Sequence, residues 1–253
     1  MTGARCGFVS AVPIMIAVLY FNRGNRVMRN TFGALLVLLM MAGPVFAESN
    51  VNPGINDYYM DPDVGSWVST FERDGREIFD RRYDILAAME VRPGMTVADV
   101  GAGTGFFTLM LARAVGPTGE VYAVDISQPF LDAIAERARA AGLNNVVTVL
   151  SDQRDVKLPA GQLDRIYIGD TYHHFEFPVT YSKTIAAALQ PQGQLIVVDF
   201  KRIPGFSSPW VLSHVRAGKE TFVAEMGQAG LSLVEDLDFM QTQYFLRLMR
   251  ADS

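Results

Sequence analysis

The sequence has very little cysteine and lacks the loop motifs of several common enzyme classes. Its 253 residues include one cysteine, Cys6, so the rest of the chain can form no disulfide, thiolate nucleophile or cysteine-based metal site. No Gly-Lys-Ser/Thr is present to grip a triphosphate, and no Gly-x-Ser-x-Gly elbow is present to carry a hydrolase serine. These absences exclude P-loop nucleoside triphosphatases and α/β-hydrolases.

Long apolar runs are also absent. The two strongest, residues 8–21 and 34–43, are shorter than the ~20 residues that a membrane-spanning helix needs. The second run comes after three arginines within residues 23–29 and before the segment Pro-Val-Phe-Ala. A positive segment, an apolar core and a small residue in this order are typical of a secretory signal.

We therefore expect residues 1–47 to be a leader that is cleaved near Ala47, with Met28 as a possible true start. The mature protein would then be exported, with the periplasm as the expected compartment. The alternative is an uncleaved membrane anchor at the N-terminus, and in that case the leader alone would contact the membrane.

Acidic residues are concentrated in the body of the chain. All 27 of them lie after residue 47, whereas four of the 22 basic residues lie before it. The body is therefore more acidic than the formal net charge of −5 indicates. An acidic body repels phosphate backbones, which argues against a nucleic-acid partner.

The body opens with a segment, residues 48–90, whose pattern differs from that of residues 91–253. Asn, Pro and Gly predict an irregular lead-in over 48–62, and apolar spacing predicts a helical stretch over 63–90. Its aromatic and basic residues would either form a lid over a site or simply pack on the domain: Tyr58, Tyr59, Trp67, Phe71 and Arg73. We expect the charged run over 73–82 to face solvent.

From residue 91 onward, short apolar strands alternate with amphipathic helices. Strands are predicted at 96–100, 120–124, 145–150, 164–169, 194–200, 231–239 and 243–249. Helices are predicted at 106–115, from Ser127 as N-cap to Gly142, from Pro178 to residue 190, and at 211–229. Such alternation indicates an α/β fold with a doubly wound, mostly parallel sheet, in which the terminal hairpin reverses one strand.

The strongest local signal is the segment VADVGAGTG at residues 97–105. A strand opens directly into Gly101-x-Gly103-x-Gly105 and then into a helix. Glycine allows positive φ angles and lets a ligand lie against the backbone, and ligands of doubly wound folds bind at the carboxyl ends of the strands. The segment therefore predicts a nucleoside-type ligand.

The side chains around this loop favour a cationic nucleoside over a dinucleotide. Phe106 stands where the dinucleotide fingerprint needs its third glycine. Asp99 places a carboxylate near the loop, which suits a positive amino group better than a diphosphate. Asp125 ends the second strand, where a carboxylate can accept both ribose hydroxyls. Asp152, after the third strand, could accept from an adenine amine.

These motifs resemble those of class I S-adenosylmethionine-dependent methyltransferases. The similarity covers VADVGAGTG, VYAVDIS, LSDQ, DRIYIGD and LQPQGQLIVVD, and more loosely the terminal strand pair. It implies a methyltransferase domain over residues 91–253 with a Rossmann-like seven-stranded sheet whose last strand is antiparallel. It also implies S-adenosylmethionine as cofactor and a small-molecule acceptor, since the branch that methylates ubiquinone and menaquinone is nearest in character.

The resemblance implies a set of cofactor-binding residues. The loop after the first strand would hold the methionine part, Asp125 the ribose, and the residues after the third strand the adenine. The full predicted set is Asp99, Gly101, Ala102, Gly103, Gly105, Asp125, Ile126, Asp152, Gln153 and Asp170.

Candidates for acid–base chemistry come after the fourth strand: Tyr172, His173 and His174. Methyl transfer needs a base only if the acceptor arrives protonated, so the histidines are either a general base or packing residues of the loop. As sequence neighbours, they are expected to point in different directions. Their spacing to His214 supports no metal site, and none is predicted.

Two other functions compete with a methyltransferase. S-adenosylmethionine is made inside cells, so an exported protein on this fold could be a non-catalytic module that binds the nucleoside. An NAD-dependent oxidoreductase is weakened by Phe106.

Overall fold

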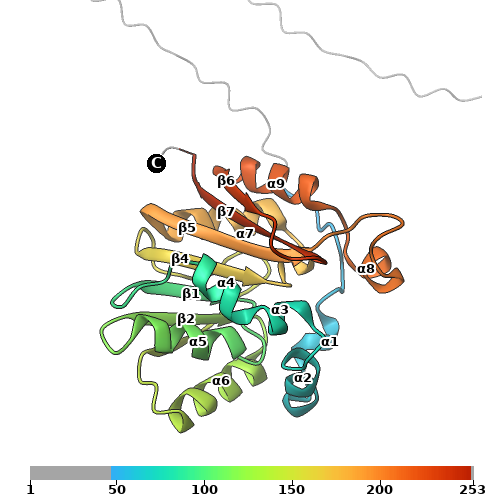
Figure 1. The fold of residues 1–253 in the computed structure, drawn as a ribbon. Helices are drawn as coiled ribbons and strands as arrows, with labels where there is room; N and C mark the ends of the chain where they lie inside the picture. Colours follow the sequence, from blue (N-terminus) through green and yellow to red (C-terminus); the bar gives the residue numbers. More distant parts are fainter. Residues whose placement is uncertain (1–46, 252–253) are drawn as a thin grey trace, which may run out of the picture. The chain divides into compact units, whose positions relative to one another are not determined.

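The structure is a computed structural model that describes residues 47–251 (Figure 1). The predicted leader and its possible start at Met28 therefore lie outside the described residues, apart from Ala47. Within residues 47–251, no helix is both long enough and apolar enough to cross a membrane.

Seven strands form one sheet in the order β3-β2-β1-β4-β5-β7-β6. The first five run parallel to their neighbours, and β7 pairs antiparallel with both β5 and β6, which confirms the predicted fold class. Their bounds are β1 (Thr96–Val100), β2 (Glu120–Asp125), β3 (Val146–Leu150), β4 (Leu163–Gly169), β5 (Leu189–Phe200), β6 (Leu231–Leu237) and β7 (Gln243–Arg250).

Short helices precede the sheet and longer ones connect its strands. Their bounds are α1 (Asp57–Met60), α2 (Val64–Phe71), α3 (Glu77–Asp80), α4 (Arg82–Ala88), α5 (Phe106–Val115), α6 (Gln128–Ala140), the 3-10 helix η1 (Tyr172–His174), α7 (Pro178–Ala188), α8 (Pro209–His214) and α9 (Lys219–Gln228). Ser127 lies at the N-cap of α6 as predicted, but its hydroxyl makes no capping hydrogen bond.

Two stretches predicted as single helices are broken. The stretch 63–90 divides into α2, α3 and α4. The break between α2 and α3 contains Gly75, which has a φ of +83° and whose N–H donates to the Asp80 carboxylate. The stretch 211–229 divides into α8 and α9. There the Arg202 side chain donates to the carbonyls of Leu212 and Val215, which ends α8. Both breaks depend on side chains outside the apolar pattern.

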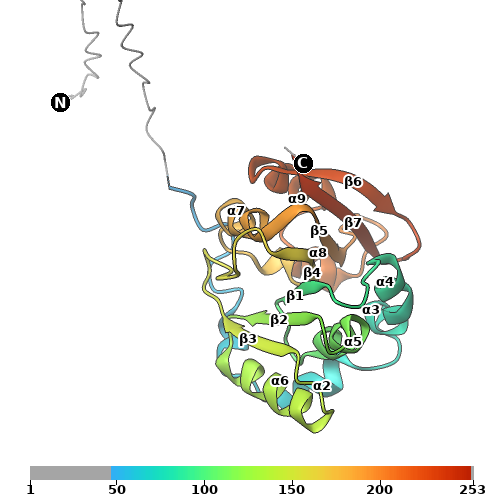
Figure 2. The ribbon, with the colours of Figure 1, turned by 90° about the vertical axis from the view of Figure 1, so that its left-hand side faces the viewer.

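The sheet has a hydrophobic core on each face, because successive residues of a strand point to opposite sides. Val97 and Val121 belong to the cluster that includes α4 and α5, whereas Ala98 and Val124 belong to the cluster that includes α7 and α9. Figure 2 shows α4 and α5 on one side of the strands and α7 on the other. This is the layered arrangement of a doubly wound fold.

The lead-in before α1 runs beside η1 and the start of α7. The Val51 N–H donates to the Glu176 carbonyl at 2.9 Å. The Glu48 carboxylate accepts from the N–H groups of Val179 and Thr180, at 2.9 and 2.6 Å, in the first turn of α7. A residue more than a hundred positions away in the chain therefore caps this helix.

The glycine loop between β1 and α5 needs its glycines for conformation and for space. Gly101 and Gly105 have φ angles of +72° and +78°. A Cβ on Gly101 would lie 2.2 Å from the Thr171 side chain, and one on Gly105 would lie 2.6 Å from Ile134 of α6. Gly105 therefore lets α5 and α6 approach each other.

Replacing Gly105 by alanine tests this close approach. Gly142 is a matched control, because its φ is +69° and a Cβ there would meet no atom within 4 Å. We expect G142A to lower the free energy of unfolding by about 1–2 kcal/mol through its left-handed backbone alone. G105A should cost a further ~1–3 kcal/mol for overlap with Ile134, as measured by urea unfolding. Equal losses for the two variants would show that Ile134 does not constrain the loop.

Candidate functional site

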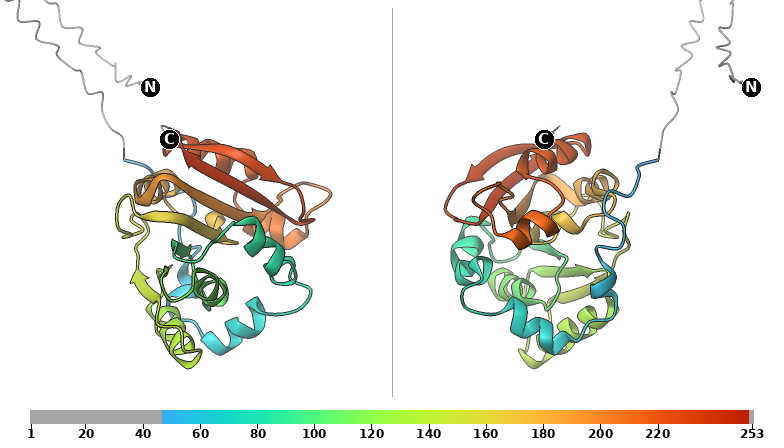
Figure 3. Two further views of the ribbon diagram at one scale, coloured as in Figure 1. Left: turned by 60° about the vertical axis from the view of Figure 1, so that its left-hand side comes forward. Right: turned by 90° about the vertical axis from the view of Figure 1, so that its right-hand side faces the viewer.

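A cavity of about 1040 Å³ lies at the carboxyl ends of the central strands. Its wall includes the glycine loop, the ends of β2 and β4, η1, and residues of α1, α2 and α8. Figure 1 shows α1, α2, α3 and α8 at the same end of the sheet, and the right panel of Figure 3 looks onto that end. Ligands of doubly wound folds bind in this position.

Most predicted site residues lie on this cavity: Asp99, Gly101, Ala102, Gly103, Asp125, Ile126, Asp152, Gln153, Asp170, His173 and His174. Gly105 and Tyr172 do not line it. Gly105 faces Ile134, as described above. The Tyr172 side chain is fully buried, and its ring lies 4.9 Å from those of Phe175 and Phe222. Tyr172 is therefore a core residue, and its predicted catalytic role is wrong.

Two buried carboxylates lie beside the glycine loop. Asp99 is 3% exposed and accepts a hydrogen bond from the Thr108 hydroxyl at 2.7 Å. Asp125 is 7% exposed and accepts from the N–H groups of Gly103 and Ser127, at 2.8 and 2.9 Å. All these donors are neutral, and neither acid forms an ion pair with any described residue. The loop is therefore built to favour a positive charge.

Burial makes these acids hard to ionise. It raises the pKa of Asp99 to about 7, and repulsion from Asp125 adds to this effect while the Thr108 hydrogen bond opposes it. Burial also raises the pKa of Asp125, against the hydrogen bonds from the backbone. A cationic ligand would favour the ionised form of both groups, whereas a diphosphate would be repelled.

Asp170 differs from these acids because its charge is already compensated. Its carboxylate accepts from the Arg76 guanidinium at 2.8 Å and from the Gln243 side chain at 2.7 Å. Arg76 also donates to the Phe71 carbonyl at 3.0 Å. The prediction that the run 73–82 faces solvent is thus wrong for Arg76, which lines the cavity. No spacing in the sequence indicated this ion pair.

Aromatic residues of α1 and α2 form a row along the cavity. The ring of Tyr59 lies 5.0 Å from that of Trp67, which lies 4.8 Å from that of Phe71. Phe71 in turn lies 3.4 Å from the position of a Cβ on Gly103. The segment predicted as either a lid or a packing helix therefore lines the site, and the row extends from the glycine loop toward η1.

Salt bridges and amide contacts fix this segment in place. Glu72, directly after α2, binds Arg137 of α6 at 2.5 Å and the Thr104 hydroxyl at 2.8 Å. Asn56, before α1, donates to the His174 carbonyl at 3.0 Å and to the Gln153 side chain at 3.4 Å. Both residues lie outside every motif, so sequence reasoning missed them.

Asp152 shapes the turn after β3. Its side chain is 55% exposed, accepts from the Arg154 and Asp155 N–H groups, and pairs with Lys157 at 3.2 Å. The backbone hydrogen bond from Arg154 and the pairing with Lys157 lower the pKa of this carboxyl. Asp152 lines the cavity. Its contact with an adenine amine stays a prediction.

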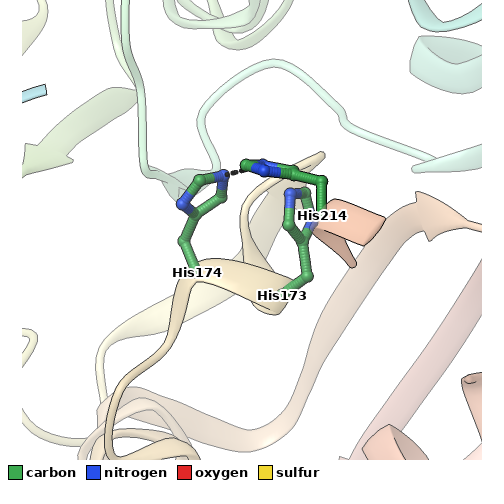
Figure 4. A group of neighbouring side chains, drawn as sticks. All are labelled: His173, His174 and His214. Atoms are coloured by element: carbon green, nitrogen blue, oxygen red, sulfur yellow. Dashed lines mark hydrogen bonds between the residues drawn. The ribbon is translucent and has the colours of Figure 1, made fainter. Parts of the chain in front are cut away.

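All three histidines of the chain meet on the cavity wall (Figure 4). His173 and His174 lie in η1, and their ring centroids are 4.3 Å apart, so the expectation that they point in different directions is wrong. His214 ends α8, and its Nε2 lies 3.3 Å from the Nε2 of His174. The Nδ1 of His173 lies 2.8 Å from the buried Asp199 carboxylate.

Burial favours the neutral forms of His174 and His214. It lowers the pKa of His174 to about 2, and the neighbouring His173 and His214 rings add to the effect. Burial likewise lowers the pKa of His214. Neither Asp199 nor His214 lies near η1 in the sequence, and this is why sequence spacing did not predict the cluster.

Comparison with known proteins relates the central part of the chain to methyltransferases. Residues 97–193 match a family model described as a methyltransferase domain. Demethylmenaquinone methyltransferase of Geobacillus kaustophilus is 30% identical over 118 residues, 47% of this chain and 50% of that protein. Nocamycin O-methyltransferase of Saccharothrix syringae is 31% identical over 134 residues, 53% of this chain and 48% of that protein. The chain thus spans about half the length of these curated relatives.

A solved structure extends the similarity beyond residues 97–193. A SAM-dependent methyltransferase from Aquifex aeolicus matches with a TM-score of 0.66 and 25% identity, over 75% of this chain and all of that one. The matched segment 97–193 contains the glycine loop, Asp125 and η1, but not α1, α2 or α8. Residues 97–193 therefore resemble a methyltransferase domain, and the fold over three quarters of the chain is that of a solved SAM-dependent methyltransferase.

Proposed function

We propose that this protein transfers the methyl group of S-adenosylmethionine to a small, largely apolar molecule bound in the same cavity. The observation that supports this most strongly is the pair of buried acids at the glycine loop, which have no basic partner among the described residues. S-adenosylmethionine carries a sulfonium and an ammonium, the charges that such a loop would favour.

The residues present fit this cofactor. Asp125 would accept hydrogen bonds from the ribose hydroxyls, and Asp99 would compensate the amino group. The glycine loop would lie against the methionine part, since Gly101 and Gly103 line the cavity. When bound, the cofactor supplies a methyl group that its own sulfonium has already activated. The protein has to align the acceptor with this group, and positioning is the main catalytic contribution expected.

The size of the cavity favours an enzyme over a module that binds only the nucleoside. Ligand pockets are typically ~300–1,000 Å³, so about 1040 Å³ leaves space for a second molecule. The region outside the matched segment supplies aromatic walls for that molecule: Tyr59, Trp67, Phe200, Phe206 and Trp210. Phe206 and Trp210 are more than half exposed.

These walls favour a flat or apolar acceptor, because aromatic rings bind such surfaces well. The Geobacillus relative is named for demethylmenaquinone, which is a molecule of this kind. We propose an acceptor with an aromatic or quinone-like ring. The fixed row along α1 and α2 would exclude water from the transfer.

We also propose that the protein acts outside the cytoplasm after removal of residues 1–47. The support is the order of the arginines, the apolar core and Ala47 in the leader. Expression of the full chain with a C-terminal tag should give a periplasmic protein whose N-terminus, read by mass spectrometry, starts at Glu48. A tagged protein that keeps its leader and stays with membranes would support the anchor instead.

Removing the Asp125 carboxylate should weaken cofactor binding. We expect calorimetry to give a micromolar Kd for S-adenosylmethionine and a Kd ~10–150-fold weaker for D125A, because charged hydrogen bonds contribute about 1.5–3 kcal/mol. Asp132, an exposed acid on α6, gives the control variant D132A, which should bind as the wild type does.

The milder D125N variant and circular dichroism separate lost binding from lost folding. D125N keeps the size of the side chain and should also bind more weakly while remaining folded. Tighter binding of NAD than of S-adenosylmethionine would contradict the proposed function. Unchanged affinity in both Asp125 variants would contradict the assigned role of this residue.

The raised pKa of Asp99 predicts a pH dependence of cofactor binding. Below about pH 7 the carboxyl is protonated in the free protein and must lose its proton to meet the ammonium. Affinity should therefore rise with pH between about 5.5 and 7, by at most ~10-fold per pH unit. D99N should bind more weakly and show a flatter profile.

Thr108 offers a variant that moves this profile in a known direction. T108V removes the hydroxyl that lowers the pKa of Asp99, so the rise in affinity should move to higher pH. The measurement is a series of calorimetric titrations at constant ionic strength. A profile that is the same in the wild type and in D99N would assign the pH dependence to another group.

A further inference from the structure

The three histidines have a geometry that the proposed methyl transfer does not require. One nitrogen of each ring can be chosen so that all three lie within 4.8 Å of one another. The Nε2 atoms of His174 and His214 lie 3.3 Å apart, and Figure 4 shows the ring of His173 directed toward the other two. Imidazole nitrogens that converge in this way are typical ligands of a transition metal.

We propose that His173, His174 and His214 bind a divalent transition metal ion of the zinc type, with one coordination position open to the cavity. The 3.3 Å distance between the Nε2 atoms of His174 and His214 fits such an ion. Zinc–nitrogen bonds are about 2.0–2.1 Å, and at a tetrahedral angle two such ligands lie roughly 3.3–3.4 Å apart. The third nitrogen lies within 4.8 Å of these two and would have to move closer to reach that spacing.

Asp199 prepares His173 for this role. The carboxylate is fully buried and accepts from the Nδ1 of His173 at 2.8 Å and from its backbone N–H at 3.1 Å. With the proton on Nδ1, the Nε2 of His173 has a free lone pair. Metal-binding histidines usually donate their other ring N–H to a carboxylate or carbonyl in this way.

The nitrogen left over on His173 is otherwise unexplained. Its Nε2 is buried and has no hydrogen-bond partner among the described residues. Buried polar atoms are normally paired, because leaving one unpaired costs about 1–3 kcal/mol. The contact between His174 and His214 uses one proton at most, so at least one of its two Nε2 atoms also offers a lone pair. A metal ion at this point would satisfy these nitrogens together.

The surroundings hold His214 in place for the ion. Its ring stacks on Trp210, with centroids 4.6 Å apart and an angle of 20° between the planes. Arg202 binds the carbonyls at the end of α8, as described above. His214 therefore approaches η1 from a helix that is fixed at its end, although the two segments are 40 residues apart in the sequence.

The number of ligands indicates what the site would do. No acid or cysteine of the described residues completes the group of three histidines. Three protein ligands with an open fourth position are typical of catalytic rather than structural zinc. The three histidines line the same cavity as the glycine loop. If the proposed methyl transfer holds, the open position would take a hydroxyl of the acceptor and favour loss of its proton to water.

Metal binding itself does not depend on that transfer and can be tested alone. The chain contains no other histidine, so an untagged, chelator-treated protein is the sample of choice. We expect calorimetry with Zn²⁺ to show one ion per chain with micromolar or tighter affinity, and Co²⁺ to give the visible absorption of a four-coordinate site. H214A and H173A should each weaken binding at least ~100-fold. The surface variant D132N should leave it unchanged.

Asp199 and thermal stability provide independent readouts. D199N should weaken Zn²⁺ binding ~10–100-fold, the usual effect of losing a carboxylate behind a metal-bound histidine. Zn²⁺ should raise the Tm of the wild type but not that of H214A, since only a folded site that binds the ion is stabilised by it. H214Q keeps a polar side chain and serves as a second variant if H214A does not fold.

Three results would overturn the metal site: no stoichiometric Zn²⁺ binding, unchanged binding in H214A and H173A, or Co²⁺ bound only in an octahedral form. The histidines would then be a packing cluster beside Trp210. Calorimetry with S-adenosylmethionine on the same samples separates the two proposals. Binding of S-adenosylmethionine without binding of zinc would contradict the metal site and leave the proposed methyl transfer standing. Binding of zinc without binding of S-adenosylmethionine would contradict the proposed methyl transfer and leave the metal site standing.

Discussion

The site depends on the burial of two carboxylates at adjacent parallel strands. Asp99 and Asp125 remain buried because the hydroxyl of Thr108 and the backbone of the glycine loop satisfy their oxygens. Neutral donors leave the charge itself uncompensated, so the loop prefers a cation. The glycines of the loop have positive φ angles, and in this conformation the Gly103 N–H donates to Asp125.

The two halves of the cavity have different origins. The half that would hold the cofactor comes from the matched domain, residues 97–193. The aromatic row of α1 and α2, together with α8, comes from outside it and forms much of the remaining wall. Arg76 joins the halves through its ion pair with Asp170, and Glu72 does so through Arg137. Relatives that methylate different acceptors are therefore expected to differ from one another in these flanking segments.

The sequence predicted the features that depend on local pattern. The seven strands, the glycine loop and its two acids were deduced from apolar periodicity and from glycine spacing. The structure shows them close to their predicted bounds, except that β5 begins at Leu189 and not at residue 194. Contacts between distant segments were missed, such as Asp199 with His173 and Arg202 with the end of α8. The orientation of residues 172–174 was also missed. Asp170 has a φ of +48°, so the alternation of side chains along β4 ends there. No periodic pattern therefore shows which of residues 172–174 face the cavity.

If residues 1–47 are removed as proposed, the cap that Glu48 places on α7 would link leader removal to the stability of the fold. Val179 and Thr180 receive their hydrogen-bond acceptor from the first residue after the predicted scission point. A peptidase that trimmed even one residue further would uncap the helix leading into β5. The position of cleavage would then be constrained by the stability of the folded domain, because cleavage one residue further would remove Glu48.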